Sequence, residues 1–390
     1  MPGIPIPPVD ERIYGILAEA GFGDDVFNPQ QHRGCELVER YALHHAIDLV
    51  GRLGLTETLA SRRTVEELLA SHGFGAGFRP ALRWLLEHLV AAGLLTREGP
   101  RYALPGPLPP PALAELRAEG LANDPSYAPA FALLDEAAAI YPRVARGETS
   151  GERALFLRVR LWTAYFSNQN RYYALNNRVA AAAAAARLPR DGGAVLEVGA
   201  GLGSATEALI AALRARGTLG ALESYDATEP VVFFRRRAEG TLGTAHPGVG
   251  LAFSALDINQ PWAGQGIEPG RHHLVWGVNV FHLARDLDAV LREALAAVAP
   301  GGWLVVGEGV RPFPGHPVGA ELPFQILESF VDVRLDPERR PTPGFLTAEQ
   351  WQGALARAGF SPVETVPDVI RMRALHPGLF AAALCGLRPG

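Results

Sequence analysis

At the centre of the chain lies Ala194-Val-Leu-Glu-Val-Gly-Ala-Gly-Leu-Gly-Ser-Ala-Thr-Glu-Ala208, and this stretch predicts the fold. Its first five residues are apolar apart from one acid, which is typical of a short buried strand. Gly199, Gly201 and Gly203 then predict a tight turn, and an apolar helix is expected over 204–216. A turn without side chains lets a ligand approach the backbone beside the helix N-terminus. The stretch therefore predicts the first half of a nucleotide-binding α/β unit.

The acid of this stretch, Glu197, precedes the first glycine by two residues and is expected to face the ligand crevice. The pattern Glu-x-Gly-x-Gly-x-Gly resembles the first motif of the class I S-adenosylmethionine (SAM)-dependent methyltransferases. SAM carries a sulfonium and an ammonium group, so an acid at the turn suits SAM better than NAD, whose phosphates it would repel. An enzyme that uses NAD at this turn is the alternative. The resemblance implies that SAM is the cofactor and S-adenosylhomocysteine the product. It also implies that SAM is bound by Glu197, Gly199, Ala200, Gly201 and Gly203.

Composition indicates an ordinary globular chain, with 390 residues, 48% hydrophobic and 20% charged. A net charge of −5 provides no electrostatic footprint for nucleic acid, and no apolar run is long enough to span a membrane. Two cysteines, Cys35 and Cys385, exclude a disulfide framework and a Cys-rich metal site, and we expect no bound metal. The N-terminus lacks the basic and apolar regions of a signal peptide, so we expect a cytoplasmic protein.

The N-terminal region is expected to be mainly helical. Its patterns predict helices over 31–53, 64–71 and 79–92, and two short strands over 93–104. This order is typical of a winged helix, which raises the hypothesis of a SAM-binding regulator on DNA as a remote alternative. The 79–92 helix is mostly apolar and carries Glu87, so we expect it to be packed inside the protein. Similar modules in small-molecule methyltransferases cover the active site or dimerise, and we expect one of these roles here.

A proline-rich linker over 105–111 ends the winged-helix pattern, and helices are expected over 112–121 and 129–140. Residues 158–178 are unusually aromatic and rich in asparagine. Packing between domains explains the aromatic residues most simply, and a substrate-pocket lining is the sharper hypothesis. Three of its residues are candidate substrate contacts: Tyr172, Tyr173 and Asn177.

Beyond the glycine turn, the chain alternates between strand and helix patterns. Further apolar runs predict strands over 222–228, 250–254, 273–279 and 303–308. Helices are expected over 286–298 and 347–358. Two final runs, 362–366 and 379–385, predict a terminal antiparallel pair.

These patterns predict an α/β fold, with a Rossmann-like seven-stranded methyltransferase sheet and a mainly helical, winged-helix-like N-terminal domain. We expect residues 1–150 to form the lid or dimerisation domain. Residues 151–390 are expected to form the SAM-binding catalytic domain.

Polar residues follow several predicted strands at the ligand edge. An acid after the second strand commonly binds ribose hydroxyls in doubly wound folds, and we favour Glu229 over Asp226 for that role. Asp257 follows the third strand beside Ile258, where its carboxylate can accept from an adenine amino group; a turn cap is the alternative. Asn279 ends the fourth strand, at the mouth of the same crevice.

His282 follows the fourth strand, and an imidazole there can act as a general base near neutral pH. Glu308 ends the fifth strand, which is adjacent to the fourth in this fold. The carboxylate can therefore orient the imidazole and stabilise its protonated form. Taken singly, each residue has a structural explanation, but their joint position at neighbouring strand ends favours a catalytic pair.

A narrower resemblance rests on the sequence around the histidine. The order Asn279-Val-Phe-His282, Arg285-Asp-Leu287, Ala299-Pro-Gly-Gly302, Glu308 resembles the C-methyltransferase domains embedded in polyketide synthases, as do Tyr172-Tyr173 and Asn176-Asn177. The resemblance implies a His–Glu catalytic pair and methyl transfer to an acidic carbon of a natural-product-type small molecule. We add Phe281, next to the histidine, to the candidate substrate contacts.

The chain departs from this family at two points. Its turn reads Gly201-Leu-Gly-Ser204 rather than Gly-Thr-Gly-Gly, and Glu229-Pro230 stands where the family has Asp followed by Ser-Pro. Small-molecule O-methyltransferases also place a histidine just after the fourth strand, so oxygen as the acceptor is the alternative. We expect a free-standing protein with a small-molecule partner; a carrier-bound substrate and a homodimer are left open.

Overall fold

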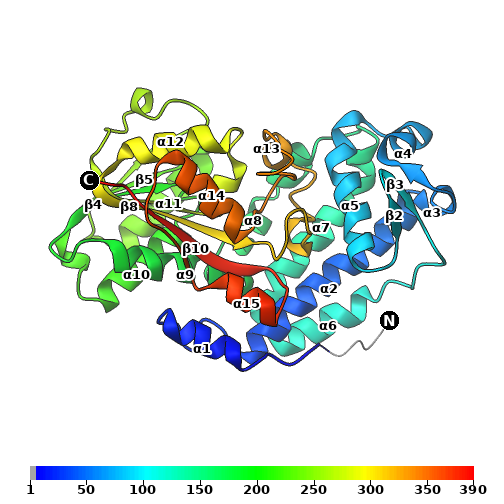
Figure 1. The fold of residues 1–390 in the computed structure, drawn as a ribbon, viewed down its shortest axis with the longest axis horizontal. Helices are drawn as coiled ribbons and strands as arrows, with labels where there is room; N and C mark the ends of the chain where they lie inside the picture. Colours follow the sequence, from blue (N-terminus) through cyan, green and yellow to red (C-terminus); the bar gives the residue numbers. More distant parts are fainter. Residues whose placement is uncertain (1–5) are drawn as a thin grey trace.

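The C-terminal part of the chain is built on a seven-stranded sheet with the order β6-β5-β4-β7-β8-β10-β9 (Figure 1). The computed structural model describes residues 6–390. The strands from β6 to β8 are parallel, whereas β10 runs antiparallel to β8 and β9. The strands are β4 Gly193–Val198, β5 Leu222–Thr228, β6 Leu251–Ser254, β7 His272–Val278, β8 Val298–Val310, β9 Val363–Val366 and β10 Phe380–Leu387. This order confirms the predicted methyltransferase sheet and its closing antiparallel pair.

Strand β8 begins at Val298, earlier than predicted, and its first residues form a bulge in the pairing with β7. His272 pairs with Val298, but Leu274 pairs with Trp303, so the residues between Val298 and Trp303 have no partners on β7. Gly301 has a φ of 76° inside this bulge, a conformation that glycine adopts without strain. The Pro-Gly-Gly run predicts a break between helix and strand, and the structure instead continues the strand through it.

Helices cover both faces of the sheet, since alternate strand residues point to opposite sides. Val195 packs in the apolar cluster with α9 and α10, and its neighbour Leu196 packs in the cluster with α12, α14 and α15. Gly307 lets α9 approach β8 closely, because a Cβ there would lie 2.4 Å from Cβ of Ala180. The helices are α9 Arg171–Arg187, α10 Ser204–Ala215, α11 Val232–Ala245, α12 Leu287–Ala297, α14 Ala348–Ala358 and α15 Val369–Leu375.

The N-terminal part is helical and contains a winged-helix-like unit. Helix α4 begins at the capping box of Thr64 and Glu67, and three short antiparallel strands follow the order β1-β3-β2. The helices are α1 Arg12–Glu19, α2 Pro29–Arg52, α3 Leu55–Thr58, α4 Val65–His72, α5 Arg79–Ala91, α6 Leu113–Asn123, α7 Ala128–Ala145 and α8 Val159–Tyr165. The strands are β1 Arg63–Thr64, β2 Thr96–Glu98 and β3 Arg101–Ala103. The helix, turn, helix and hairpin therefore form as predicted.

Short turns and irregular segments connect these elements. The proline-rich residues 105–111 have no helix or strand, as the composition predicts. Single-turn helices occur at Ala76–Phe78, Pro125–Tyr127, Glu152–Phe156, Leu219–Ala221, Ala263–Gln265, Phe281–Leu283, Gly319–Glu321 and, as α13, Glu328–Val331.

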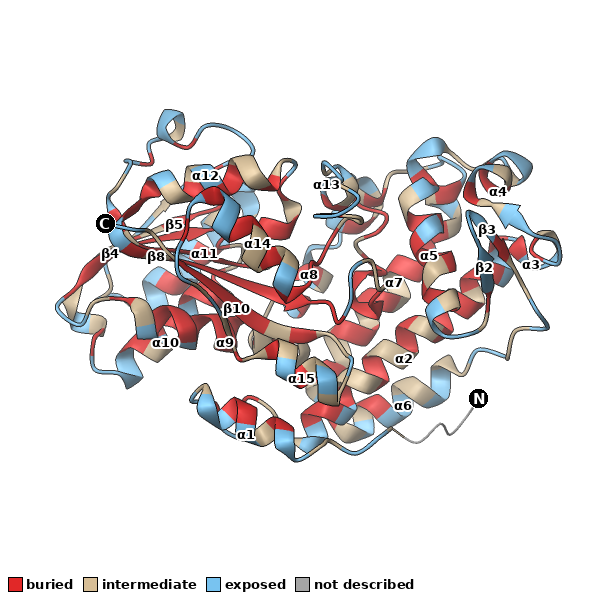
Figure 2. Cartoon of the chain, in the orientation of Figure 1, coloured by how far each residue is buried: buried red, intermediate tan, exposed pale blue. Residues whose placement is uncertain are grey.

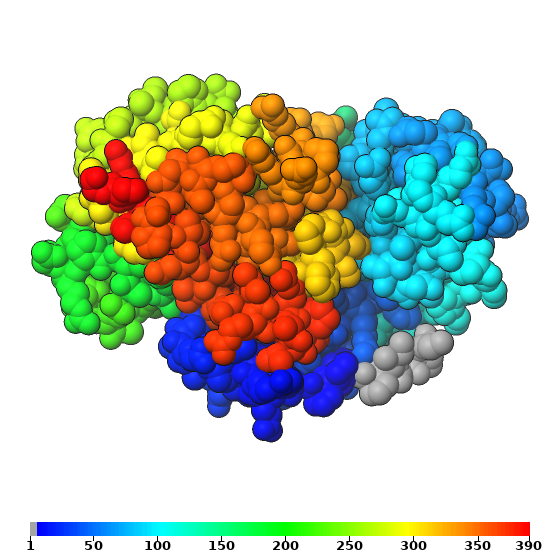
Figure 3. All heavy atoms as spheres, viewed as in Figure 1, coloured from blue at the N-terminus to red at the C-terminus, as the bar shows by residue number. Residues whose placement is uncertain are grey.

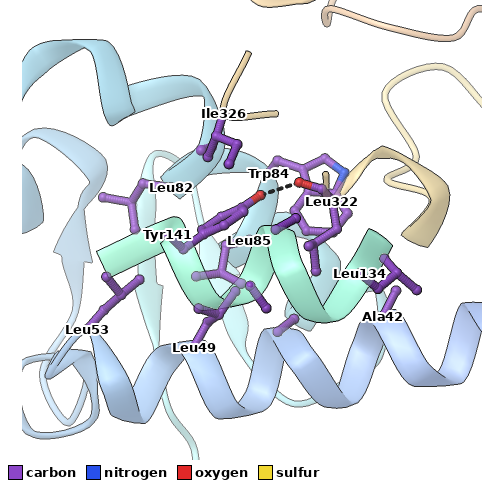
Figure 4. Close-up of a cluster of buried hydrophobic side chains, with 14 of the residues drawn as sticks. Ala42, Leu49, Leu53, Leu82, Trp84, Leu85, Leu134, Tyr141, Leu322 and Ile326 are labelled. Atoms are coloured by element: carbon purple, nitrogen blue, oxygen red, sulfur yellow. Dashed lines mark hydrogen bonds between the residues drawn. The ribbon is translucent and has the colours of Figure 1, made fainter. Parts of the chain in front are cut away.

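The segment after β8 joins the two parts of the molecule. Leu322 and Ile326 pack among apolar side chains of α2, α5 and α7 (Figure 4). The Tyr141 hydroxyl donates to the carbonyl of Leu322 at 2.6 Å. Figure 3 shows the yellow-orange and orange atoms of residues that follow β8 in the sequence directly beside the blue and cyan atoms of the N-terminal part. The N-terminal helical core therefore includes residues from the C-terminal half of the sequence.

Helix α5 presents its apolar side to this core, including Leu82, Leu85, Leu86 and Leu89. Figure 2 shows the same pattern of burial along α5 and the central strands. None of the helices in the described part of the chain is long and apolar enough to cross a membrane.

Candidate active site

The glycine turn between β4 and α10 forms one side of the candidate site. Gly199, Gly201 and Gly203 have φ values of 69°, 55° and 87°, which favour glycine at all three positions. A Cβ on Gly199 would lie 2.5 Å from Val280, and one on Gly203 would lie 2.6 Å from Leu242. A Cβ on Gly201 would meet nothing within 4 Å. Two glycines are therefore needed for packing, and the middle one leaves open space at the sheet edge.

Glu197 is buried at the end of β4, with Ala200 buried in the turn that follows. Its Oε2 accepts from Thr206 of α10 at 2.7 Å and from Tyr225 of β5 at 2.6 Å. Its Oε1 has no hydrogen-bond partner among the described residues. Burial raises the pKa of this carboxyl from 4.5 to about 7. Glu197 thus combines a structural role on one oxygen with an unused acceptor on the other.

Glu229 follows β5 and reaches the glycine turn. Its Oε2 accepts from the backbone N–H of Gly201 at 3.0 Å, and its Oε1 accepts from that of Val231 at 2.8 Å. Burial raises the pKa of the Glu229 carboxyl. The competing acid, Asp226, instead lies 3.3 Å from His272. Of the two acids, the structure places Glu229 at the turn.

Asp257 and Ile258 lie in the loop after β6. Asp257 is exposed, and its Oδ1 accepts from the backbone N–H of Asn259 at 2.9 Å. This contact is the turn cap that the sequence analysis gives as the alternative. Ile258 is half-buried against the apolar cluster of α12, and its carbonyl accepts from Trp262 at 3.2 Å.

Asn279 follows β7 with a φ of 54°, the one non-glycine residue with a positive φ in the described part of the chain. Its N–H donates to Gly307 of β8 at 2.8 Å, and its side-chain oxygen accepts from Asn176 of α9 at 2.8 Å. Such conformations persist where surrounding contacts impose them, and they cluster at functional sites. The strained residue lies between the glycine turn and the histidine predicted as a base.

His282 and Glu308 meet as a buried pair. The Nδ1 of His282 lies 2.7 Å from Oε2 of Glu308, and the backbone N–H of His282 donates to Oε1 at 3.2 Å. Arg340 donates to the carbonyl of His282, and the rings of Phe330 and Phe345 lie 5.6 and 5.0 Å from the imidazole. With Nδ1 directed at the carboxylate, the Nε2 side of the ring is left for the cavity that His282 lines. The sequence predicted this pairing from two neighbouring strand ends.

A cavity of about 570 Å³ adjoins His282. Its wall combines α2, the aromatic segment before and along α9, the segment after β8, and the loop between α15 and β10. Tyr172 and Tyr173, two of the candidate substrate contacts, line it. Burial raises the pKa of both phenols, which keeps them neutral and able to donate hydrogen bonds.

Two predicted substrate contacts need correction. Asn177 is fully buried, donates to Asn168 at 2.9 Å and does not line the cavity. Asn176 lines it instead, because the two neighbours point to different sides of α9. Phe281 is fully buried among apolar residues beneath the loop, so it supports His282 rather than reaching the cavity.

Several polar residues in and near the cavity wall lacked a predicted role. Glu39 of α2 accepts from the backbone N–H of Gly319 at 2.6 Å, and burial raises its pKa to about 7. Arg311 and Glu321 form a buried ion pair at 2.6 Å that holds the segment after β8. Glu39 lies 280 residues before Gly319, so no local sequence pattern indicates that contact.

Comparisons with known proteins give two kinds of likeness. No family model matches the chain. Over 174 residues it is 33% identical to fumosorinone synthetase of Cordyceps fumosorosea, covering 44% of this chain and 4% of the relative. Over 181 residues it is 32% identical to the highly reducing polyketide synthase otaA of Aspergillus niger, covering 45% of this chain and 7% of that synthase. The matched stretches are thus small parts of much longer relatives.

Solved structures match nearly the whole chain. The CurJ carbon methyltransferase has a TM-score of 0.80 at 21% identity, covering 97% of this chain and 98% of that one. The DszA carbon methyltransferase has a TM-score of 0.75 at 23% identity, with coverage of 99% and 97%. The trans-methyltransferase CalH, solved as a complex with SAH, has a TM-score of 0.64 at 17% identity, with coverage of 92% and 91%. The chain has the class I methyltransferase fold; it resembles solved carbon methyltransferases in fold and, over part of its length, a highly reducing polyketide synthase in sequence.

Proposed function

We propose that this protein is a SAM-dependent methyltransferase that transfers a methyl group to an acidic carbon of a small molecule. The observation that carries the proposal is the buried pair of His282 and Glu308, with Nδ1 and Oε2 2.7 Å apart, in which His282 lines a cavity of about 570 Å³. The likeness to carbon methyltransferases supports carbon as the acceptor. Glu308 is a positioning residue, and His282 is the proposed catalytic base.

The residues at the glycine turn fit SAM. Glu197 has an unpartnered buried oxygen that suits the cationic ammonium group, and Gly201 leaves the backbone open for the methionine part. Glu229 retains acceptor capacity for ribose hydroxyls, and Asp257 with Ile258 would contact the adenine. Asn279 would lie beside the methionine part. When bound, SAM supplies an electrophilic methyl group on a sulfonium.

His282 is held in the orientation that a base needs. The neutral imidazole donates from Nδ1 to Glu308, which leaves Nε2 as the acceptor on the cavity side. Nε2 would remove the proton of the acidic carbon, and Glu308 would stabilise the imidazolium that results. The electron pair left on that carbon would form the new bond to the methyl group, while the C–S bond pair would stay on sulfur in the S-adenosylhomocysteine that leaves. The rings of Phe330 and Phe345 keep water away from the imidazole.

The N-terminal region completes the cavity. Gln31, Cys35 and Glu39, all on α2, line it together with His282. We therefore propose that residues 1–150 close the site and that residues 151–390 carry the cofactor and the catalytic pair. The apolar face of α5 lies in the core, which argues against a DNA-binding role.

Product analysis tests the proposal. Purified protein is incubated with SAM labelled with ¹³C in its methyl group and with acetoacetyl-pantetheine, a β-keto thioester whose central carbon is acidic. A phenol of similar size serves as the oxygen acceptor in parallel. We expect a new carbon–methyl resonance with the thioester only. An oxygen–methyl product from the phenol alone would replace the proposal by the O-methyltransferase alternative, and SAM binding without transfer to either acceptor would contradict an acidic-carbon substrate of this class.

A further inference from the structure

A second cluster of side chains lies on the cavity wall, apart from His282 and Glu308. It contains His32 and Glu36 of α2 and His376, which follows α15. One ligand atom from each residue lies within 4.8 Å of the others. His32 and Glu36 are four residues apart and so share one face of the helix. His376 comes from the other end of the chain, 340 residues beyond Glu36.

Hydrogen bonding accounts for only part of this arrangement. The Nε2 of His376 lies 3.1 Å from Glu36, and the Nε2 of His32 lies 3.2 Å from the carbonyl of Pro7. The two imidazoles approach with their ring centres 4.8 Å apart at 80°, and no hydrogen bond joins these two rings. A His–Glu bond alone does not require the second imidazole at the same point.

The chemistry of the three groups is that of a metal site. Two imidazoles and one carboxylate form a common ligand set for Zn²⁺, with an open fourth position. His32 is buried, and Glu36 and His376 are half-buried. Zinc is held by neutral imidazole nitrogens and by carboxylate oxygens, the two kinds of atom that this cluster offers.

We propose that His32, Glu36 and His376 bind one Zn²⁺ ion whose fourth position faces the cavity. The three residues line the same cavity as His282, so water or an oxygen donor of a bound small molecule can complete the coordination. Zn–N and Zn–O bonds of about 2.0–2.2 Å put tetrahedral ligand atoms about 3.4 Å apart, so atoms up to 4.8 Å apart must approach by at most about 1.4 Å. The ion ties α2 to the loop before β10 across the cavity. This departs from the expectation, based on the few cysteines, that no metal binds.

Metal binding to the untagged full-length protein tests the proposal without any methyl-transfer assay. Protein treated with chelator is titrated with Zn²⁺ by calorimetry, and with Co²⁺ as an absorption probe of tetrahedral coordination. We expect one Zn²⁺ per chain, a Co²⁺ spectrum typical of four ligands, and a rise in melting temperature with Zn²⁺. Absence of binding up to 100 μM Zn²⁺, or an octahedral Co²⁺ spectrum, would overturn the proposal.

Variants then assign the ligands. Three variants should each weaken Zn²⁺ binding: His32→Ala, Glu36→Gln and His376→Ala. Each loss should exceed the 10–100-fold that is typical when a residue hydrogen-bonded to a metal ligand is removed. His316→Ala, which changes a cavity histidine outside the cluster, should bind Zn²⁺ as the unmodified protein does. Circular dichroism checks that each variant is folded. If a variant does not fold, the Co²⁺ spectrum of the unmodified protein still tests whether the metal has four ligands. Undiminished affinity in folded variants would overturn the assignment.

Discussion

Replacing Glu197 by glutamine should change how stability depends on pH. The carboxyl is buried, and its pKa rises from 4.5 to about 7 because of that burial. The folded protein therefore binds more protons at this group than the unfolded chain does between these values. The resulting stabilisation is present in full below pH 4.5, declines as the pH rises, and is lost above about 7. Glutamine cannot ionise, so the variant lacks this decline.

The size of the effect follows from the same shift. One pKa unit corresponds to 1.36 kcal/mol, so ionising Glu197 costs about 3 kcal/mol more in the folded protein than in the unfolded chain. Between pH 5 and pH 8 in urea unfolding, the free energy of unfolding of the unmodified protein should fall by about 2–3 kcal/mol more than that of Glu197→Gln. Glutamine keeps an oxygen for Thr206 and Tyr225, so both bonds survive. Glu268→Gln, at an exposed acid, is the matched control. A stability difference that is the same at both pH values would refute this reasoning.

Three further changes test the turn, the cofactor site and the core. Gly203→Ala should destabilise the fold by about 1–3 kcal/mol, because a Cβ would lie 2.6 Å from Leu242 at a φ of 87°; urea unfolding measures this. Glu229→Gln should weaken SAM binding by about 10–100-fold in calorimetry, since an acceptor for the ribose becomes a donor. Tyr141→Phe should cost about 1–3 kcal/mol in the same unfolding assay, because the buried carbonyl of Leu322 loses its 2.6 Å hydrogen bond.

Two of these changes have a control variant, and each has a result that would contradict its argument. Gly220→Ala should be nearly neutral, since a Cβ there meets nothing within 4 Å, and an equal loss at both glycines would contradict the packing argument. Asp226→Gln should leave SAM affinity unchanged, and a greater loss there than at Glu229 would reverse the choice between the two acids. For Tyr141, no loss of stability would mean that water replaces the hydroxyl at Leu322.

Much of the fold was predictable because its signals are local. The apolar run ending at Glu197 and the glycines after it predicted β4, the turn and α10 within a residue or two. The packing of Leu322 and Ile326 into the N-terminal core was not predictable, because it joins segments that share no sequence pattern.

The candidate site was predictable where the fold itself brings residues together. His282 and Glu308 follow adjacent parallel strands, so their contact follows from strand order. Asn176 and Asn177 are adjacent on a helix, and sequence alone could not decide which of them faces the cavity. The meeting of Glu36 and His376 depends on how the chain ends pack, which strand and helix patterns do not determine.

The measurement that tests the central proposal most directly is the turnover of His282→Ala at saturating SAM with the β-keto thioester. Loss of a general base typically lowers rates by about 10²–10⁴-fold, and we expect a loss on that scale with SAM affinity nearly unchanged. Glu308→Gln should lose less, because the imidazole remains but its orientation is weakened. His72→Ala, a histidine of α4 outside the cavity, should retain full turnover. Turnover of His282→Ala close to that of the unmodified protein would contradict the assignment of His282 as the base.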